Sequence, residues 1–423
     1  MAAKNPGHAA NLSAPSHRAS GMRGRDPNEA HRASTPLELL FDLTFVIAFG
    51  SAAEQFADAL AEGHYQTGLL GFGFAMFAVC WAWINFSWFA SAYDTDDWLF
   101  RLATMVQMIG VLIVALGLPR MFASIEQGAR FDVGILVLGY VVMRLAAMFQ
   151  WLRAARQDPA RRNAALTYAG TIAIAQVGWV AWCLLSPVGA WLIVSAAVLY
   201  LIEMAGPILA ESKNGGTPWH AHHIAERYGL LAIIALGEGV VGTVASMSAI
   251  VETNGWTADA FLICAAGVGL TFGMWWVYFI LPSAPILHHR RRRAIVWGYA
   301  HMLVFAAIAA TGAGLHVAAI SMQGHAHIGE AAVVLTVAVP VGLFVLMVYG
   351  LYYSLIRTFD WFHLLLLALT AAVLAASIGF AQAGVSMTAC LIVVMLGPVV
   401  SVVGYEVVGH RHATTGLQSE IRG

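Results

Sequence analysis

The sequence predicts an all-α membrane protein, a polytopic bundle of about twelve transmembrane helices. Three observations favour this fold class. First, 60% of the 423 residues are hydrophobic and only 11% are charged, whereas a soluble domain usually carries about 25% charged residues. Second, the apolar residues gather in runs of about 20 residues, the length that crosses a bilayer as a helix. Third, lysine and arginine concentrate in every second connection between the runs, which is typical of membrane proteins with a fixed orientation.

Twelve apolar runs are the predicted helices, and polar segments separate them. With their connections they make a transmembrane domain over residues 35–410, with candidate halves of six helices at 36–210 and 222–408. In chain order the runs are 36–59, 67–90, 98–118, 131–152, 165–185, 190–210, 223–249, 257–281, 294–320, 329–355, 361–383 and 386–408.

The two ends of the chain lie outside this domain. Residues 1–34 are rich in Gly, Ser, Pro and Arg and lack the apolar stretch of a secretory signal, so we expect a disordered arm. Residues 411–423 form a short tail. The connections on the same side as both ends hold most of the positive charge, for example Arg153, Arg290–Arg293 and Arg357. Both termini are therefore predicted to be cytoplasmic.

The two halves carry a weak internal repeat. Leu43–Gly50 reads LTFVIAFG and Leu230–Gly237 reads LLAIIALG, each near the start of a half. The next helix in each half is rich in tryptophan. Because each half has an even number of helices, a pseudo-two-fold axis along the membrane normal would relate the halves. Chance similarity between helices of like composition is the alternative explanation.

Acidic residues in the first helix are the first candidates for function. Glu38 and Asp42 lie four residues apart and share one face. A charge inside a bilayer costs about 2.5 kcal/mol or more unless it faces protein, water or a partner. The pair is therefore a candidate proton or ion site. The alternative is that both acids lie at the membrane interface, where they cap the helix start after Thr35 and Pro36.

Three aspartates, Asp94, Asp96 and Asp97, follow the second helix. Clustered carboxylates suit Mg²⁺ or Ca²⁺, so an Mg²⁺ site is one interpretation. The other is capping of the third helix by Thr95 or Asp96, with an ion pair from Asp97 to Arg101 four residues later. We favour the second, because no calcium-loop spacing is present. No further cofactor is predicted, since the four cysteines lie in apolar runs without C-x-x-C spacing.

The seventh helix holds the third group of candidates, in the sequence HAHHIAERYGLLAIIALGEG. Glu226 and Glu238 are about 18 Å apart along a helix, which places Glu238 deep in the bilayer. Intramembrane acids usually have a function, so Glu238 is the leading single candidate. Its alternative role is a structural ion pair with Arg144 of the fourth helix. Polar residues in other apolar runs, such as His301, are expected to make interhelical hydrogen bonds or to extend a polar path.

Three stretches of the chain resemble the bacterial low-temperature-requirement A (LtrA) family. They are TPLELLFDLTFV at 35–46, YDTDD at 93–97 followed by Arg101, and ERYGLLAIIALGE at 226–238. The similarity extends over nearly all of residues 34–400. It implies a multi-pass protein of the bacterial inner membrane and names no substrate. The family's motif acids correspond to Glu38, Asp42, Asp96, Asp97, Glu226 and Glu238.

The leading functional hypothesis is a proton-coupled secondary transporter of a small solute. In this hypothesis Glu38 and Glu226 shape the cytoplasmic entrance. Glu238, together with Asp42, binds the coupling proton or a cationic group of the solute. Two arginines are candidate counter-charges in the empty state, Arg144 and Arg101.

Two other hypotheses remain open at this stage. One is an integral-membrane enzyme acting on a lipid or isoprenoid substrate, with Mg²⁺ held by Asp94, Asp96 and Asp97. The other is a cold-related structural or sensory membrane protein. The expected partners are the lipid bilayer and a small solute or lipid substrate. A net charge of −1 gives no reason to expect a nucleic-acid partner.

Overall fold

The computed structural model describes residues 18–29, 32–128, 131–213, 215–357 and 360–410. Helices are the regular secondary structure of these residues, and no strand occurs among them. Twelve helices in this part of the chain are long and apolar enough to cross a membrane. The predicted fold class is confirmed.

The first half contains six of these helices in the predicted order: α1 (Pro36–Ala61), α2 (Tyr65–Tyr93), α3 (Trp98–Glu126), α4 (Gly134–Gln157), α5 (Arg162–Leu185) and α6 (Ala190–Glu211). The second half contains α7 (Ala221–Asn254), α8 (Ala258–Phe279), the short helix α9 (Ser283–His289), the 3₁₀ turn η2 (Arg291–Arg293), α10 (Ala294–Met322), α11 (Glu330–Ile356), α12 (Trp361–Gln382) and α13 (Met387–Gly404).

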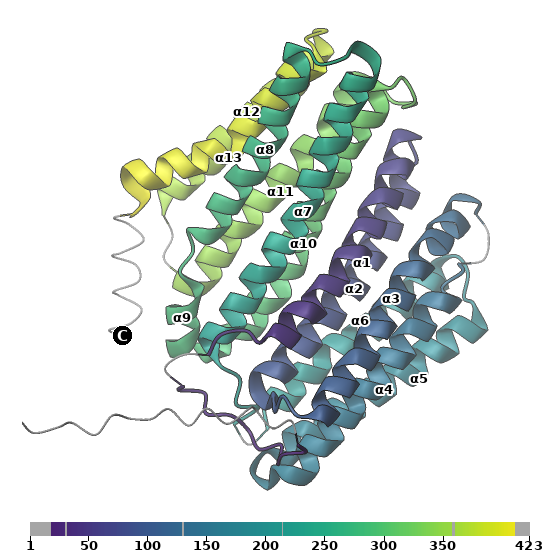
Figure 1. Ribbon diagram of the computed structural model, residues 1–423, viewed down its shortest axis with the longest axis vertical. Coiled ribbons are helices and arrows are strands. Elements are labelled where there is room, and N and C mark those ends of the chain that lie inside the picture. Colours follow the sequence, from purple (N-terminus) through teal and green to yellow (C-terminus); the bar gives the residue numbers. More distant parts are fainter. Residues whose placement is uncertain (1–17, 30–31, 129–130, 214, 358–359, 411–423) are drawn as a thin grey trace, which may run out of the picture.

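The halves lie beside each other, with α1 at their border (Figure 1). Helices α1 and α2 pack against α7 and α10, and these contacts join the halves. Both α1 and α7 begin at the end of the bundle that also carries Arg153, Arg290–Arg293 and Arg357. We call this the arginine-rich end.

The neighbours of each helix follow the same order in both halves. The first helix packs against the second and third, the third against the fourth, the fourth against the fifth, and the fifth against the sixth. In the second half α8 packs in addition against α13. This shared order is what the predicted repeat requires, and the pseudo-two-fold axis stays a prediction.

Side-chain caps fix where several helices begin. Thr35 and Glu38 form a capping box at α1, with Glu38 Oε2 accepting from the Thr35 amide at 2.7 Å. Asp97, rather than Thr95 or Asp96, caps α3 by accepting from the Phe100 amide. Such caps satisfy amides that a helix cannot satisfy internally.

The described part of the N-terminal arm lies across the arginine-rich end. Residues 1–17 fall outside the described chain, but residues 18–29 and 32–34 are held by acceptors on the bundle. The amides of Met22 and Gly24 donate to Gln157 and Asp158, and the amide of Arg25 donates to the carbonyl of Ala92. The Met22 side chain is fully buried. Composition predicts disorder throughout residues 1–34. A prediction from composition cannot take into account acceptors that lie far along the chain, such as Gln157 and Asp158.

Candidate functional site between the two halves

Two acids on α1 face two basic side chains on α7 where the halves meet. Nε2 of His223 lies 3.1 Å from Oε1 and 3.2 Å from Oε2 of Glu38. Nη2 of Arg227 lies 2.6 Å from Oδ1 of Asp42. Each pair of residues is spaced i, i+4 on its helix, so the two faces match along their length. All four side chains have an exposed fraction of 0%. We call these four residues the α1–α7 cluster.

Helix α2 closes the cluster from a third side. The indole Nε1 of Trp83 donates to Asp42 Oδ1 at 2.7 Å, and Arg227 Nη2 donates to Ser87 Oγ at 3.2 Å. The Arg227 guanidinium also lies 5.6 Å from the centre of the Trp83 ring, within cation–π range. The Asp42–Arg227 pair is therefore bonded to helices of both halves.

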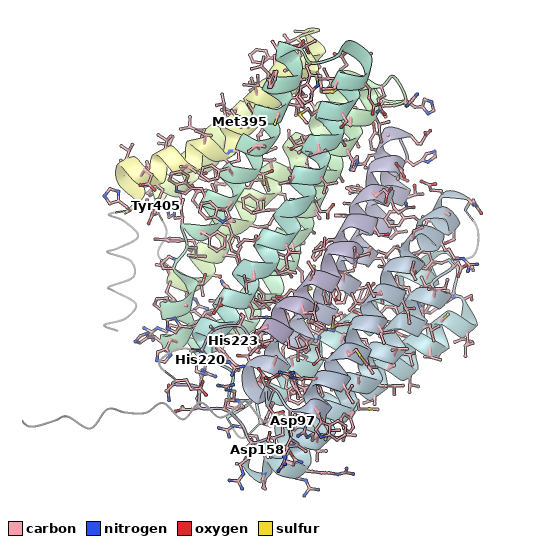
Figure 2. The ribbon with its side chains drawn as sticks, in the orientation of Figure 1. Asp97, Asp158, His220, His223, Met395 and Tyr405 are labelled. Carbon is pink, nitrogen blue, oxygen red and sulfur yellow. The ribbon has the colours of Figure 1, made fainter. Side chains whose placement is uncertain are left out.

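Several atoms of the cluster have no hydrogen-bond partner within the described chain. They include Asp42 Oδ2, His223 Nδ1, and Nε and Nη1 of Arg227. Buried polar atoms are nearly always bonded to protein or to water. The cluster therefore has capacity to bind water or a polar solute group. Figure 2 shows His223 with His220 at the arginine-rich end, where the two halves meet.

Glu238 lies deeper, between α1, α7 and α10. Its exposed fraction is 7%. A Cβ built on Gly50 of α1 would be 3.4 Å from Glu238 Oε1, and one built on Gly312 of α10 would be 2.7 Å from Glu238 Cβ. The absence of a side chain at Gly312 lets α10 approach the backbone and Cβ of Glu238 closely, and Gly50 of α1 faces the carboxylate. No hydrogen bond or ion pair to Glu238 is found in the described ranges.

Comparison with known proteins identifies the family. The model of the bacterial low temperature requirement A protein (LtrA) family matches residues 33–397. The chain belongs to the LtrA family.

One relative of this LtrA protein is an uncharacterized protein of Rhizobium meliloti (strain 1021). The two are 28% identical over 266 residues, which is 60% of each chain. No solved structure matches the chain. Membership in the LtrA family thus confirms the multi-pass membrane assignment, and the functional argument depends on the geometry of the site.

Arg144, which was expected to pair with Glu238, lies elsewhere in this LtrA protein. Arg144 of α4 donates from Nη2 to Glu203 Oε2 of α6 at 2.9 Å, and both side chains are buried. The predicted pairing of Arg144 with Glu238 is therefore wrong, because Glu203 is the nearer acid. Glu226 is exposed at the arginine-rich end, where it accepts from the Ser34 amide of the N-terminal arm.

The three aspartates of the YDTDD segment each have a different role. Asp96 binds Arg101 at 2.8 Å, and both are exposed, so Arg101 is not close to Glu238 as a counter-charge. Asp97 pairs with Arg153 instead of Arg101. Asp94 Oδ1 accepts from the Asp96 amide. Among the described residues, no group of three or more His, Cys, Asp or Glu side chains is arranged to hold a metal ion.

Two carboxyls of this connection have opposite pKa shifts. Burial, with the nearby Glu38 carboxylate, raises the pKa of Asp94 to about 6. Burial also opposes ionisation of Asp97, but hydrogen bonds from Arg153 and from the Phe100 and Ser20 amides outweigh it. They hold the pKa of Asp97 below its usual range. Figure 2 shows Asp97 and Asp158 at the arginine-rich end of the first half.

His301 is buried in the second half, apart from the α1–α7 cluster. Its Nδ1 lies 2.8 Å from the Trp297 carbonyl and its Nε2 lies 3.1 Å from the Tyr278 hydroxyl. It lines a cavity of ≈ 200 Å³ beneath α9, together with Trp297, whose indole Nε1 has no partner within the described chain. The expectation of interhelical hydrogen bonds is confirmed for His301.

Sequence reasoning did not choose His223 and Arg227 as site residues. The signal was present, because both lie on one helical face with the same i, i+4 spacing as Glu38 and Asp42. Matching the spacing of acids on one predicted helix to that of bases on another would have found the pairing.

Proposed function

We propose that this LtrA protein is a proton-coupled secondary transporter of a small solute, with both termini on the cytoplasmic side of the inner membrane. The observation that carries the proposal is the set of buried ionisable groups where the two halves meet. Buried charge costs free energy in a membrane protein and usually serves a function. Secondary transporters place their binding sites near the bilayer midplane between two repeated halves.

Two levels of the interface have different chemistry in this proposal. Near the arginine-rich end, Glu38 and Asp42 are balanced by His223 and Arg227. Deeper in the bundle, no such counter-charge pairs with Glu238 among the described residues. Asp42 is neutralised by Arg227, so the coupling proton is assigned to Glu238 alone. When Glu238 loses its proton, the carboxylate attracts a cationic group of the solute.

The α1–α7 cluster would serve as a contact that breaks and re-forms when the halves move. Its ion pairs join α1 of one half to α7 of the other, and hydrogen bonds of Trp83 and Ser87 add α2. The unbonded nitrogens of Arg227 can bind water or solute once the pair opens. Separating a buried ion pair costs free energy unless other groups compensate the charges, so water or bound solute would have to replace the lost contacts when the pair opens.

The cytoplasmic assignment rests on the distribution of arginine. Arg153, Arg290–Arg293 and Arg357 share one end of the bundle, and positive charge favours the cytoplasmic side. The enzyme hypothesis draws on a different feature, the cavity lined by His301, Tyr278 and Trp297. It gains less support, because the three aspartates proposed to hold Mg²⁺ have separate partners.

A ligand-stabilisation screen tests the proposal. Wild type and Glu238→Gln would be melted in detergent with pooled amino acids, sugars, polyamines, metal ions and lipids at two pH values. A ligand at 100 times its Kd raises stability by about 2.7 kcal/mol. We expect a soluble hit that is recovered unchanged by mass spectrometry and whose pH dependence disappears in Glu238→Gln. A hit recovered chemically altered would favour the enzyme hypothesis.

A further inference from the structure

A strongly basic cavity lies at the arginine-rich end of the second half. It has a volume of ≈ 950 Å³ and is formed by α9, η2, the start of α10 and the end of α11. Six consecutive basic residues, His288–Arg293, line it together with Arg357. The transport proposal uses none of these residues except as markers of orientation.

Two of the arginines hold the wall of the cavity. Arg291 donates from Nη2 to the Trp219 carbonyl at 2.8 Å, and its guanidinium lies 3.8 Å from the centre of the Trp219 ring. Arg293 donates to the Leu355 carbonyl of α11. These contacts tie η2 to the connection before α7 and to α11, so the basic segment has a defined position.

Two other arginines have side chains available to a ligand. Arg292 and Arg357 are exposed, and neither side chain makes a hydrogen bond or ion pair with another described residue. A guanidinium presents paired N–H donors that match the oxygens of a phosphate. Two such groups on one cavity wall favour an anionic ligand.

Exposed apolar side chains of the same cavity indicate its depth in the membrane. Val296 has an exposed fraction of 63% and Tyr353 one of 55%. Tyrosine beside arginine is typical of the level where hydrocarbon meets the headgroups. Basic pockets between transmembrane helices at this level bind anionic headgroups.

We propose that this cavity binds an anionic phospholipid. Arg292 and Arg357 contact the phosphate of its headgroup, and Val296 and Tyr353 contact the first part of its acyl chains. A soluble phosphate compound would offer the same charge. The exposed apolar side chains favour the lipid, because a soluble anion gains nothing from contact with them.

Lipid retention measured by native mass spectrometry tests this inference. Wild-type protein would be reconstituted in equal amounts of phosphatidylglycerol and phosphatidylcholine, extracted, and examined for bound lipid. We expect phosphatidylglycerol to be retained in preference. The double variant Arg292→Gln/Arg357→Gln should weaken this retention roughly ten- to thirtyfold, since each arginine near an anionic surface contributes roughly a factor of five.

The matched control is Arg156→Gln/Arg162→Gln. It removes two exposed arginines at the same end of the first half and should leave retention within about twofold of wild type. If the double variant does not fold, Arg292→Gln alone replaces it. Equal retention of both lipids by wild type, or an equal loss in the control, would overturn the inference. So would inorganic phosphate that displaces phosphatidylglycerol at millimolar concentration, because it would indicate a soluble ligand.

Discussion

At the scale of single residues, two buried glutamates differ in their partners. Glu203 Oε2 accepts from Arg144 Nη2 at 2.9 Å and from Trp81 Nε1 at 2.8 Å. Glu238 is almost as buried, yet no ion pair reaches it within the described chain. The first carboxylate is therefore structural, and the second can gain or lose a proton without breaking a protein contact.

This difference predicts opposite effects of the same substitution. Glu203→Gln leaves the Arg144 guanidinium buried without its counter-charge and should cost about 3–5 kcal/mol of stability. Glu238→Gln removes a buried acid without a partner and should leave stability unchanged or slightly raised. Thermal melting of both variants in detergent measures the effects. A Glu238→Gln variant that melts as early as Glu203→Gln would assign Glu238 a structural role.

Two aspartates in the connection after α2 make stability depend on pH in opposite ways. The folded protein raises the pKa of Asp94 to about 6 by burial, so it binds that proton more tightly than the unfolded chain does. Stability from this group falls as pH rises from about 4 to about 6. Asp97, whose pKa is lowered by its partners, contributes stability above about pH 4 and loses it in stronger acid.

The two Asp→Asn variants should therefore shift the melting temperature in opposite directions at pH 7.5. Asp94→Asn should raise stability, by on the order of 2 kcal/mol. Asp97→Asn should lower it by about 3 kcal/mol or more, because Arg153 loses its partner. Repeating the melts at pH 4.5 should shrink the difference for Asp94→Asn and leave most of the deficit for Asp97→Asn. A gain in Asp94→Asn that is the same at both pH values would contradict this account.

The sequence identified the buried acids but not their partners. A carboxylate in an apolar run is visible from a few neighbouring residues, which is why Asp42 and Glu238 were found. Its partner depends on which helices touch. The predicted helices offered Arg144 as an intramembrane arginine for Glu238. In the structure, the packing of the first half places Arg144 of α4 beside Glu203 of α6.

At the scale of elements, glycine decides how closely helices approach. A Cβ built on Gly139 of α4 would lie 2.6 Å from the Val114 amide nitrogen and 2.7 Å from the Gly110 carbonyl oxygen of α3. Both are backbone atoms, which cannot rotate away. The α3–α4 contact thus requires glycine, as small residues do in other membrane helix pairs.

Gly139→Ala should force the two helices apart and cost about 1–3 kcal/mol. Gly170→Ala on α5 is the control, because no atom lies within 4 Å of its built Cβ. That control should be neutral or stabilising by up to about 1 kcal/mol, since alanine favours the helix. Both are measured by melting. Equal melting of the two variants would mean that α3 and α4 are not in this close contact.

Element boundaries followed the sequence where hydropathy changes sharply and departed from it where polar residues continue a helix. The predicted span 223–249 extends in the structure over Ala221–Asn254, because His220 caps its start and its polar last turn continues the hydrogen-bond pattern. The N-terminal arm shows the same effect of context. Its residues favour no regular structure, and acceptors from α2 and α4 nevertheless order residues 18–29.

At the scale of the whole molecule, the halves meet through few helices. Helices α1 and α2 contact α7 and α10, and the buried ionisable groups lie along this border (Figure 1). The same border also holds aromatic pairs from opposite halves, Trp83 with Tyr228 and with Phe305. Ionisable and aromatic contacts together therefore join the halves.

Proton movement across a membrane tests the central claim most directly. Purified protein would be placed in liposomes that contain a pH-sensitive dye, and pooled amino acids, sugars, organic acids and polyamines would be added under an imposed pH gradient. We predict that one pool collapses the gradient with wild type and not with Glu238→Gln, while both proteins melt at the same temperature. Collapse at the same rate with Glu238→Gln, or no collapse with any pool for wild type, would contradict the account.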